Sequence, residues 1–573
     1  SKRSFFMKNH GITSRVSQTF SGDKVPKLTK AIYPWSGIFR DACYALVGTF
    51  LLQYAMTAGV LSSDVEVYKS QMQIITIFMM LALVWDGIND PIMGFIVERV
   101  HFKTGKYKPW ILLGAIGNSI MVTLMFLVGP LGVRGWGYVA CMLIFYFLWD
   151  LLFTMNDIGY WSMLPSLTND PKERSRLTTN VTVATTIGAF MMNLLMFLLP
   201  TMLGAQTAYA YAGVIVSILF LVSQALIFFL CKEKERDPVQ EEASEKTHFL
   251  DLFKMVKENK QLLVVAIAML LYYFAAGMLT GIGLNYYYLL YGYGTFKGGI
   301  MATVLSIVFV LGTLLAQFFY PLLSKKFKKM QLITVTSIVI IVAYLLFYLL
   351  GFPVFSDMPI AHNDPALTAS GSMIDGILFA FGGTHWIIFL LAFLFFAATG
   401  IFYLALLVMF QDAIDYQEWK FGERKEAIAF AWRPLDAKIG SALQTGMRNI
   451  TFLASGTYLI INNISTAESH NVIENGTSVY KGTYESFEAE IEAAYQWSDK
   501  QQQLAIFGAV VIGIIIVAFL ACFLLLKFGY HIDEDLENQI VKELKERHEK
   551  DENKIEIDAK IPEVKMPNDL ISK

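Results

Sequence analysis

Trp85-Asp86-Gly87-Ile88-Asn89-Asp90-Pro91 sets two carboxylates and an amide inside an apolar segment that runs from Ile74 to Val97. An ionised side chain at the depth of a bilayer costs several kcal/mol, so such groups face a cavity, pair with an opposite charge or bind an ion. Asp86 and Asp90 are four residues apart and share one helix face. Because two close carboxylates destabilise each other's charged form unless a cation lies between them, the pair indicates a proton or metal-ion site.

The composition around this stretch is typical of a polytopic membrane protein. Of the 573 residues, 55% are hydrophobic and only 16% are charged, and the mean hydropathy is +0.48. The net charge of −2 argues against a nucleic-acid partner. The four cysteines form no CxxC motif or Cys/His cluster, so neither a disulfide framework nor a zinc site is supported. No nucleophile-base grouping or cofactor fingerprint is present, and we expect neither an enzyme nor a cofactor.

Hydrophobic windows long enough to cross about 30 Å of hydrocarbon predict twelve membrane-spanning helices. They lie at roughly 34–58, 71–98, 109–130, 136–165, 178–203, 210–231, 261–291, 297–323, 331–352, 385–411, 427–462 and 501–527. Lysine and arginine concentrate in every second loop, beginning with the loop after the second helix. The positive-inside rule therefore predicts that both termini are cytosolic.

A long charged connection divides the helices six and six, and basic turns recur after the second and the eighth helix. Two six-helix halves with a site at the midplane describe an all-α major-facilitator fold. The predicted parts are a cytosolic N-terminal arm (1–33), a first half (34–231), a cytosolic central loop (232–260), a second half (261–527) with extracellular insertions near 353–384 and 463–500, and a charged cytosolic tail (528–573).

The two insertions and the tail leave alternatives open. The insertions are polar and contain Gly, Asn and Ser, which suits either ordered caps or mobile loops. Within the tail, Ile540 and Leu544 with nearby Glu and Lys predict a short amphipathic helix. We expect this helix to be solvated, with docking on the cytosolic face as the alternative.

Three sequence blocks in the same order carry a resemblance to the glycoside-pentoside-hexuronide:cation symporter family. They are Trp85 to Gly94 followed by Gly105 to Ile111, Asn156 to Pro165 followed by Asp170 to Arg174, and Asp415 to Lys420 followed by Glu426 to Phe430. The resemblance covers roughly residues 35 to 460. It implies a major-facilitator fold and a symporter that imports a sugar or glycoside by alternating access, driven by a Na⁺ or H⁺ gradient.

A coupling-cation site is the first thing that the resemblance implies. Asp86, Asn89 and Asp90, with Thr154 and Asp157, match the positions that form this site in family members. Geometry supports the set independently, because Thr154 and Asp157 are three residues apart and share a helix face. Together the two helices would offer carboxylate, amide and hydroxyl oxygens to a hard cation.

The identity of the ion is a separate expectation. We expect Na⁺, held by Asp86, Asp90 and Asp157, because the set offers more oxygen ligands than a proton needs. H⁺ is the rival, and Li⁺ could substitute for Na⁺. The alternative for these acids is a scaffold role, paired with Arg40 or Lys438.

The resemblance also implies a sugar site. Arg40 and Asp41 on the first helix match a family pair whose acid binds sugar hydroxyls, Asp157 matches a second sugar-binding acid, and Trp161 matches an aromatic that stacks on the sugar. Alternatively, Trp161 is an interfacial anchor and Arg40 a snorkelling one.

Departures from the family leave the identity of the sugar open. A family arginine on the fifth helix falls at Thr182 here. The eleventh helix keeps Lys438 but has Arg433 in place of a glutamine. Asp150, seven residues before Asp157, replaces a glycine and lies near the same helix face, so we include Asp150, Arg433 and Lys438 among the substrate-binding candidates.

The sequence thus predicts a cation-coupled sugar or glycoside symporter, and the alternative is a major-facilitator exporter of another small organic solute. Its expected partners are a sugar or glycoside, the coupling cation and the lipid bilayer. We expect a monomer. The absence of a signal peptide, the cytosolic termini and the family resemblance together suggest the inner or plasma membrane of a bacterium.

Overall fold

The computed structural model describes residues 25–100, 102–168, 170–233, 257–352, 354, 373–382, 385–422, 432–474, 476–496 and 499–560. Most of the predicted N-terminal arm, central loop and first insertion therefore lies outside the described residues. The described chain is almost entirely helical, and its one sheet is a two-stranded hairpin.

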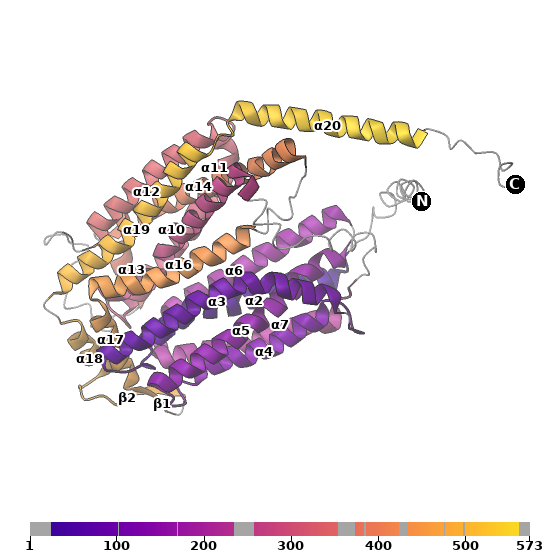
Figure 1. Ribbon diagram of the computed structural model, residues 1–573. Helices are drawn as coiled ribbons and strands as arrows, with labels where there is room; N and C mark the ends of the chain where they lie inside the picture. Colours follow the sequence, from indigo (N-terminus) through magenta and orange to yellow (C-terminus); the bar gives the residue numbers. More distant parts are fainter. Residues whose placement is uncertain are drawn as a thin grey trace.

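The first half is a bundle of long helices that pack against one another (Figure 1). They are α2 (Lys27–Thr57), α3 (Val65–Arg99), α4 (Lys108–Leu127), α5 (Gly135–Met163) with the 3-10 turn η1 (Leu164–Leu167), α6 (Pro171–Leu203) and α7 (Ala205–Leu230). Helix α2 begins at Lys27, earlier than the predicted boundary at residue 34, and continues through Pro34.

The second half forms a separate bundle beside the first (Figure 1). Its helices are α10 (Lys260–Tyr291), α11 (Phe296–Leu323), α12 (Lys329–Gly351), the short α13 (Met373–Phe381), α14 (His385–Phe421), α16 (Trp432–Ser455) and α19 (Lys500–Gly529). The halves meet where α3 packs on α16 and α6 packs on α11. The predicted division into two halves therefore agrees with the packing.

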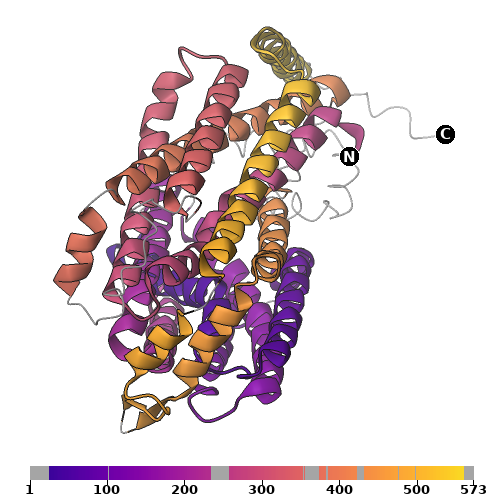
Figure 2. The ribbon, with the colours of Figure 1, turned by 90° about the vertical axis from the view of Figure 1, so that its left-hand side faces the viewer.

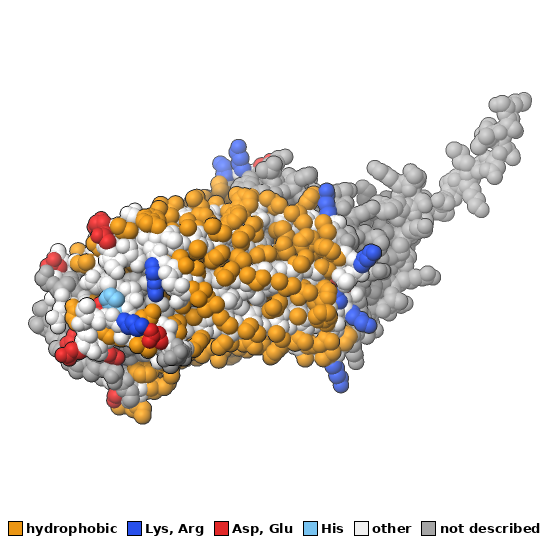
Figure 3. Space-filling view, turned by 90° about the horizontal axis from the view of Figure 1, so that it is seen from below, with side chains coloured by type: hydrophobic (Ala, Val, Ile, Leu, Met, Phe, Trp, Pro, Cys, Tyr) orange, Lys and Arg blue, Asp and Glu red, His pale blue; other side chains and the backbone are white. Residues whose placement is uncertain are grey.

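Ten of the described helices are long and apolar enough to span a membrane, which makes the chain a multi-pass membrane protein. Helices α2 and α16 are not among these ten, although their 31 and 24 residues would reach across and they pack along α6 and α10. Both contain charged residues, which lowers their hydropathy. The number twelve remains a prediction. Figure 3 shows the hydrophobic side chains as a broad band around one face of the molecule.

The second insertion folds into an ordered cap, composed of α17 (Tyr458–Ser469), the antiparallel strands β1 (Asn471–Glu474) and β2 (Thr477–Tyr480), and α18 (Phe487–Ala494). Gly456, with φ +73°, separates α16 from α17, so the predicted single helix at 427–462 is two helices at a turn that favours glycine. Both ribbon views place this cap at one end of the molecule and α20 (Glu534–Lys560) at the other (Figures 1 and 2).

The cap joins the two halves through hydrogen bonds. Asn462 Nδ2 donates to the carbonyl of Ser62 at 2.9 Å, and Tyr211 Oη donates to the carbonyl of Gly476 at 2.7 Å. Gln206 Nε2 donates to the carbonyl of Glu468 at 3.2 Å. Since Ser62, Gln206 and Tyr211 belong to the first half, the halves are bonded to each other at this end.

Glu468 is the buried carboxylate of the cap. Its Oε1 accepts hydrogen bonds from Tyr293 Oη at 2.6 Å and from the backbone N–H of Ala205 at 3.3 Å, and Asn471 Nδ2 donates to Oε2 at 3.3 Å. The side chain is 1% exposed. Burial raises the pKa of Glu468 above its ordinary 4.5, against the opposing effect of these hydrogen bonds. Its protonation state is therefore linked to folding of the cap.

We expect Glu468→Gln to reduce the dependence of thermal stability on pH. A carboxyl whose pKa is raised on folding stabilises the fold fully below its unfolded pKa, and this contribution is lost as pH rises through the folded pKa. The melting temperature of the wild type should therefore fall relative to the variant as pH rises from about 4.5. Thermal unfolding of the purified protein across pH checks this, with the exposed hairpin variant Glu474→Gln as control. Parallel pH profiles for wild type and Glu468→Gln would contradict it.

The tail helix α20 is docked over its first turns instead of solvated. Glu537 pairs with Lys329 Nζ at 2.6 Å, and Trp419 Nε1 donates to Glu543 Oε2 at 2.7 Å. Ile540 and Leu544 are buried against the second half. The apolar side of the helix predicted from the sequence thus has a partner surface, which the sequence alone did not reveal.

Candidate functional site

The carboxylate pair on α3 is neutralised by a lysine from the other half. Lys438 Nζ on α16 lies 2.8 Å from Asp86 Oδ2, forms a second ion pair with Asp90, and donates to the backbone carbonyl of Asp86 at 3.3 Å. The acids are four apart on one face, as predicted, and the ammonium lies between them. In this conformation Lys438 thus provides the cation that the two acids require.

One other candidate of the predicted cation site, Thr154, contacts this pair directly. Thr154 Oγ1 on α5 donates to Asp86 Oδ1 at 3.1 Å, which joins α3 to α5. Asn89 is 4% exposed, and its Nδ2 has no hydrogen-bond partner among the described residues. Asp157, the fifth candidate, is held elsewhere. The structure therefore joins three of the five candidates, Asp86, Asp90 and Thr154, in one cluster with Lys438, and Asn89 precedes Asp90 on the same helix.

Asp157 and Asp41 share the guanidinium of Arg40. Arg40 Nη2 lies 2.7 Å from Asp41 Oδ1, and Nη1 donates to Asp157 Oδ1. The Arg40 side chain is 4% exposed, and its guanidinium lies 4.7 Å from the ring centre of Tyr160 and 5.5 Å from that of Trp161. An arginine enclosed in this way is not a snorkelling anchor, and the Trp161 ring lies beside this cation.

A cavity of about 690 Å³ lies between the halves. Asp41, Asp86, Asp150 and Thr154 line it, together with aromatic side chains that include Tyr44 and Trp149. The remaining candidates do not contribute to the lining; they are Arg40, Asn89, Asp90, Asp157, Trp161, Arg433 and Lys438. Asp41 and Asp86 thus line the cavity, whereas Arg40 and Lys438, the cations that pair with them, do not. A mostly apolar pocket with a few polar groups is typical of small-molecule sites.

Arg433 lies apart from both ion-pair clusters. Its Nη2 donates to Tyr403 Oη at 3.0 Å, and Tyr403 also shares a 3.1 Å hydrogen bond with Tyr273 Oη. All three residues belong to the second half. Arg433 therefore contacts tyrosine hydroxyls in this conformation, and its predicted contact with substrate stays a prediction.

Asp150 lines the cavity, and one of its two carboxylate oxygens has no hydrogen-bond donor within the described parts of the chain. The side chain is 5% exposed, and Oδ2 has no hydrogen-bond partner among the described residues. A buried carboxylate oxygen of this kind is costly unless a ligand or an ion supplies a donor.

For Asp150→Asn we expect about a tenfold weaker apparent affinity for substrate, with thermal stability unchanged or higher. A hydrogen bond to a charged acceptor contributes about 1.5–3 kcal/mol against about 1 kcal/mol for a neutral one, and 1.4 kcal/mol is tenfold in affinity. Concentration-dependent uptake into proteoliposomes measures this, with the exposed tail variant Asp535→Asn as control. Unaltered transport and binding in the variant would refute a role for Asp150.

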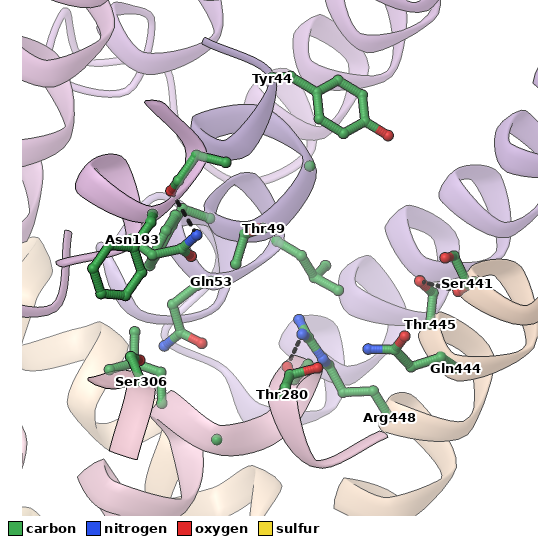
Figure 4. A pocket seen from close by; sticks show the side chains of 18 of the residues that line it. Tyr44, Thr49, Gln53, Asn193, Thr280, Ser306, Ser441, Gln444, Thr445 and Arg448 are labelled. Atoms are coloured by element: carbon green, nitrogen blue, oxygen red, sulfur yellow. Dashed lines mark hydrogen bonds between the residues drawn. The ribbon is translucent and has the colours of Figure 1, made fainter. Parts of the chain in front are cut away.

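Several polar side chains of the cavity were missed by the sequence reasoning. Figure 4 shows Gln53 of α2 and Asn193 of α6 across from Gln444 and Arg448 of α16. The sequence did contain one signal. Gln444 and Arg448 are four residues apart, so they share one face of a helix that is long enough to span a membrane. No family block covers them, and polar residues on a helix face do not by themselves reveal a cavity.

The acids do not form a dense metal cluster in this conformation. Within the parts of the chain that the structure describes, no group of three or more His, Cys, Asp or Glu side chains is arranged to hold a metal ion. A coupling ion is transported cargo and not a resident cofactor. Such an ion would find oxygen ligands at Asp86, Asp90 and Thr154, where Lys438 now supplies the positive charge.

Sequence comparisons match this chain to sugar transport proteins. A family model described as MFS/sugar transport protein matches residues 65–534. The raffinose carrier protein of Pediococcus pentosaceus is 25% identical over 443 residues, which are 74% of this chain and 62% of that protein. The isoprimeverose transporter of Lactiplantibacillus pentosus is 25% identical over 458 residues, 78% of this chain and 85% of that protein. The chain thus spans less than two thirds of the raffinose carrier.

Solved structures with the same fold are also transporters. A bacterial homologue of the human lysosomal transporter Spinster, in an inward-facing and unoccupied conformation, superimposes with a TM-score of 0.53 at 14% identity and covers 88% of this chain and 96% of its own. A point mutant of the nucleoside transporter NupG gives 0.50 at 12% identity, with coverage of 86% and 100%. At these identities the likeness establishes the fold alone; with the family model, it confirms the predicted major-facilitator architecture.

Proposed function

Because this chain belongs to the MFS/sugar transport protein family, we propose that it is a cation-coupled symporter that imports a sugar or glycoside by alternating access. Its relatives are named as sugar carriers and transporters, which supports a transporter rather than an enzyme. The observation that best supports coupling between ion binding and transport is the contact of Lys438 with Asp86 and Asp90, because this contact joins the two halves beside the cavity.

The coupling step follows from competition for the same carboxylates. A cation that binds Asp86 and Asp90 takes over the role of the Lys438 ammonium, because the two positive groups compete for one pair of acids. Releasing Lys438 removes an ion pair between α3 and α16, so the halves can separate along this seam. The reverse holds as well, since a conformation that withdraws Lys438 leaves the acids with a higher affinity for the cation.

Sugar binding connects to the same acids through the cavity wall. Asp86 faces the cavity and accepts from Thr154, while Asp41 faces it from the cluster held by Arg40. A sugar hydroxyl can donate to either carboxylate, and the aromatic lining suits the apolar face of a pyranose ring. The ion and the sugar thus both contact Asp86, so the binding of one can raise the affinity of the protein for the other.

The conformation seen is closed at the cap. Hydrogen bonds of Asn462, Gln206 and Tyr211 link the halves there. The basic loops of the sequence assign the cap to the outside and both termini to the cytosol. The state is then closed to the outside, with Lys438 in place on Asp86 and Asp90.

We further propose Na⁺ as the coupling ion and a bacterial inner or plasma membrane as the location. The three connected oxygen-bearing side chains next to Lys438, those of Asp86, Asp90 and Thr154, support Na⁺, because a proton would need a single carboxylate. H⁺ is the alternative for the ion. The two bundles of one chain already supply both walls of the cavity, which supports a monomeric transporter.

Uptake by proteoliposomes tests the proposal. The reconstituted protein is given an inward Na⁺ gradient or an inward pH gradient, with galactosides, glucosides, pentosides and hexuronides as radiolabelled substrates. Sugar accumulation that follows the Na⁺ gradient is the expected result, and accumulation that follows only the pH gradient would replace Na⁺ by H⁺. A response to neither gradient would refute symport, and efflux of an unrelated solute would favour an exporter.

A further inference from the structure

The cap is attached to the second half of the molecule. The chain enters it from α16 and leaves it into α19, and both of these helices belong to the second half. Tyr495, which follows α18, donates through Oη to the carbonyl of Tyr288 near the end of α10 and accepts from the backbone N–H of Tyr293 at 2.9 Å. Tyr458 Oη donates to Asn449 Oδ1 of α16. When the halves move relative to each other, the cap therefore moves with the second half.

On its other side the cap rests on the first half through separate, individually weak contacts. The hydrogen bonds of Asn462, Gln206 and Tyr211 cross this boundary. The rings of Tyr68 on α3 and Tyr458 on α17 meet edge to face there, with their centres 6.0 Å apart. A single hydrogen bond contributes little net free energy, so a few of them can break and form again as the halves move.

The first half has a seat that is shaped for the cap. Gly59, just after α2, has φ +69°, and a Cβ at this position would collide with the backbone nitrogen of Ser469 in the cap. A side chain here would hold the cap away from the first half. Arg134 fixes the seat, because Nη1 donates to the carbonyl of Gly59 at 2.6 Å and Nη2 donates to Gln206 Oε1 at 3.1 Å.

Glu468 contacts both halves from within the cap. Its Oε1 accepts hydrogen bonds from Tyr293 Oη of the second half at 2.6 Å and from the backbone N–H of Ala205, the first residue of α7, at 3.3 Å. The side chain is 1% exposed while the cap is seated. If the cap left the first half, the bond to Ala205 would break and external water would reach the carboxylate.

The proton of Glu468 is therefore linked to the position of the cap. The titratable and charged groups around it are Tyr288, Tyr293, Arg134, His470 and Glu490. Arg134 bonds to Gln206, and His470 pairs with Glu490 rather than with Glu468. Burial raises the pKa of Glu468 above the 4.5 of an exposed glutamate. A rise in external pH above about 4.5 thus favours the position in which this carboxyl is exposed.

We propose that the cap is the outer gate of this transporter, a lid that is carried by the second half and lifts from the first half when the cavity opens to the outside. Glu468 is the proton-sensitive latch of this lid, so acid outside holds the lid shut. The inference rests on the proposed alternating access and adds the element that controls entry from the outside.

Labelling of a cysteine in the cavity measures opening of the lid. Ser306 lines the cavity, and its hydroxyl donates to the carbonyl of Ala302 in its own helix, so Ser306→Cys is a mild probe. It is placed in the full chain with the four native cysteines replaced by alanine. Right-side-out vesicles then receive a membrane-impermeant thiol reagent. Rates are divided by those of the exposed cap probe Thr483→Cys, which corrects for the pH dependence of the thiol.

We expect Tyr211→Phe and Asn462→Ala each to raise the labelling rate about fivefold, since a net hydrogen bond corresponds to roughly that factor in an equilibrium constant. Tyr480→Phe is the matched control, because its hydroxyl bonds to Glu490 within the cap and its loss should leave the rate unchanged. As external pH rises from about 4.5 to about 7.5, the rate should increase in the wild type and stay constant in Glu468→Gln.

Two results would overturn the inference. Labelling of Tyr211→Phe and Asn462→Ala at the wild-type rate would refute the lid, and a wild-type pH profile in Glu468→Gln would refute the latch. Sugar uptake by the same vesicles separates these failures from failure of the proposed function. Intact uptake with unaltered labelling refutes only the lid, whereas a cavity cysteine that stays unlabelled in every variant, together with no sugar uptake, refutes alternating access itself.

Discussion

Replacing Lys438 with methionine is expected to lower coupled uptake at least tenfold and to destabilise the protein. The substitution keeps an apolar stem but removes the ammonium that pairs with Asp86 and Asp90. Removing one partner of a buried ion pair costs about 3–5 kcal/mol, and we expect the lower end because the Asp90 side chain is 35% exposed. Initial rates in proteoliposomes and thermal unfolding in detergent measure the two effects.

Sodium should stabilise Lys438→Met more than it stabilises the wild type. In the variant the two carboxylates have no competing ammonium, so the cation binds them more tightly, and tighter binding to the folded state raises the melting temperature further. Adding Asp90→Asn to Lys438→Met removes one of the like charges and should recover part of the stability. The exposed Lys420→Met is the matched control. Wild-type uptake in Lys438→Met, or an identical sodium response, would contradict the competition mechanism.

Replacing Arg40 with glutamine is expected to produce the second large effect, a loss of uptake of at least tenfold with lowered thermal stability. Arg40 is the shared cation of Asp41 and Asp157, and its side chain is 4% exposed. A neutral amide would leave two acids near one another without a positive charge, which raises the free energy of the folded state. Uptake at saturating sugar and thermal unfolding measure the two effects.

Arg40→Lys separates charge from geometry. Lysine keeps the charge but lacks the planar fork that reaches both carboxylates at once, so we expect an intermediate loss. Lys30→Gln on the same helix is the control. Lys30 forms a partly exposed ion pair with Glu173, and the loss of this pair should lower the free energy of unfolding by less than about 1 kcal/mol. If Arg40→Gln transported sugar as the wild type does, Asp41 and Asp157 would not depend on this arginine.

The architecture was predictable because hydropathy and charge act locally along the chain. A run of apolar residues between basic loops specifies a spanning helix whatever its neighbours are, and the long charged connection specifies two halves. The Asp86 and Asp90 pair was likewise predictable, since four-residue spacing fixes one face of a helix. Helix ends were less certain, as α2 and the break at Gly456 show, because capping and packing decide them.

The partners of the acids depended on the tertiary structure. Lys438 is 348 residues from Asp90, and Arg40 is 117 residues from Asp157. Sequence reasoning named both cations as possible partners but did not assign them, and it grouped Asp157 with Asp86. The structure holds Asp157 with Arg40 instead in this conformation, because the long Arg40 side chain of α2 reaches Asp157 of α5, while α3 packs on α16 and its acids meet Lys438.

By itself, the sequence determined that this chain is a membrane protein of two helical halves with costly acids on its second predicted helix, since each of these features depends on local composition and spacing. Only the tertiary structure decided which cation neutralises each acid and which polar side chains face the cavity. The physical reason is that the rotation of each helix about its axis is set by packing against its neighbours, so Gln53, Tyr287 and Arg448 become a common surface only when the two halves are assembled.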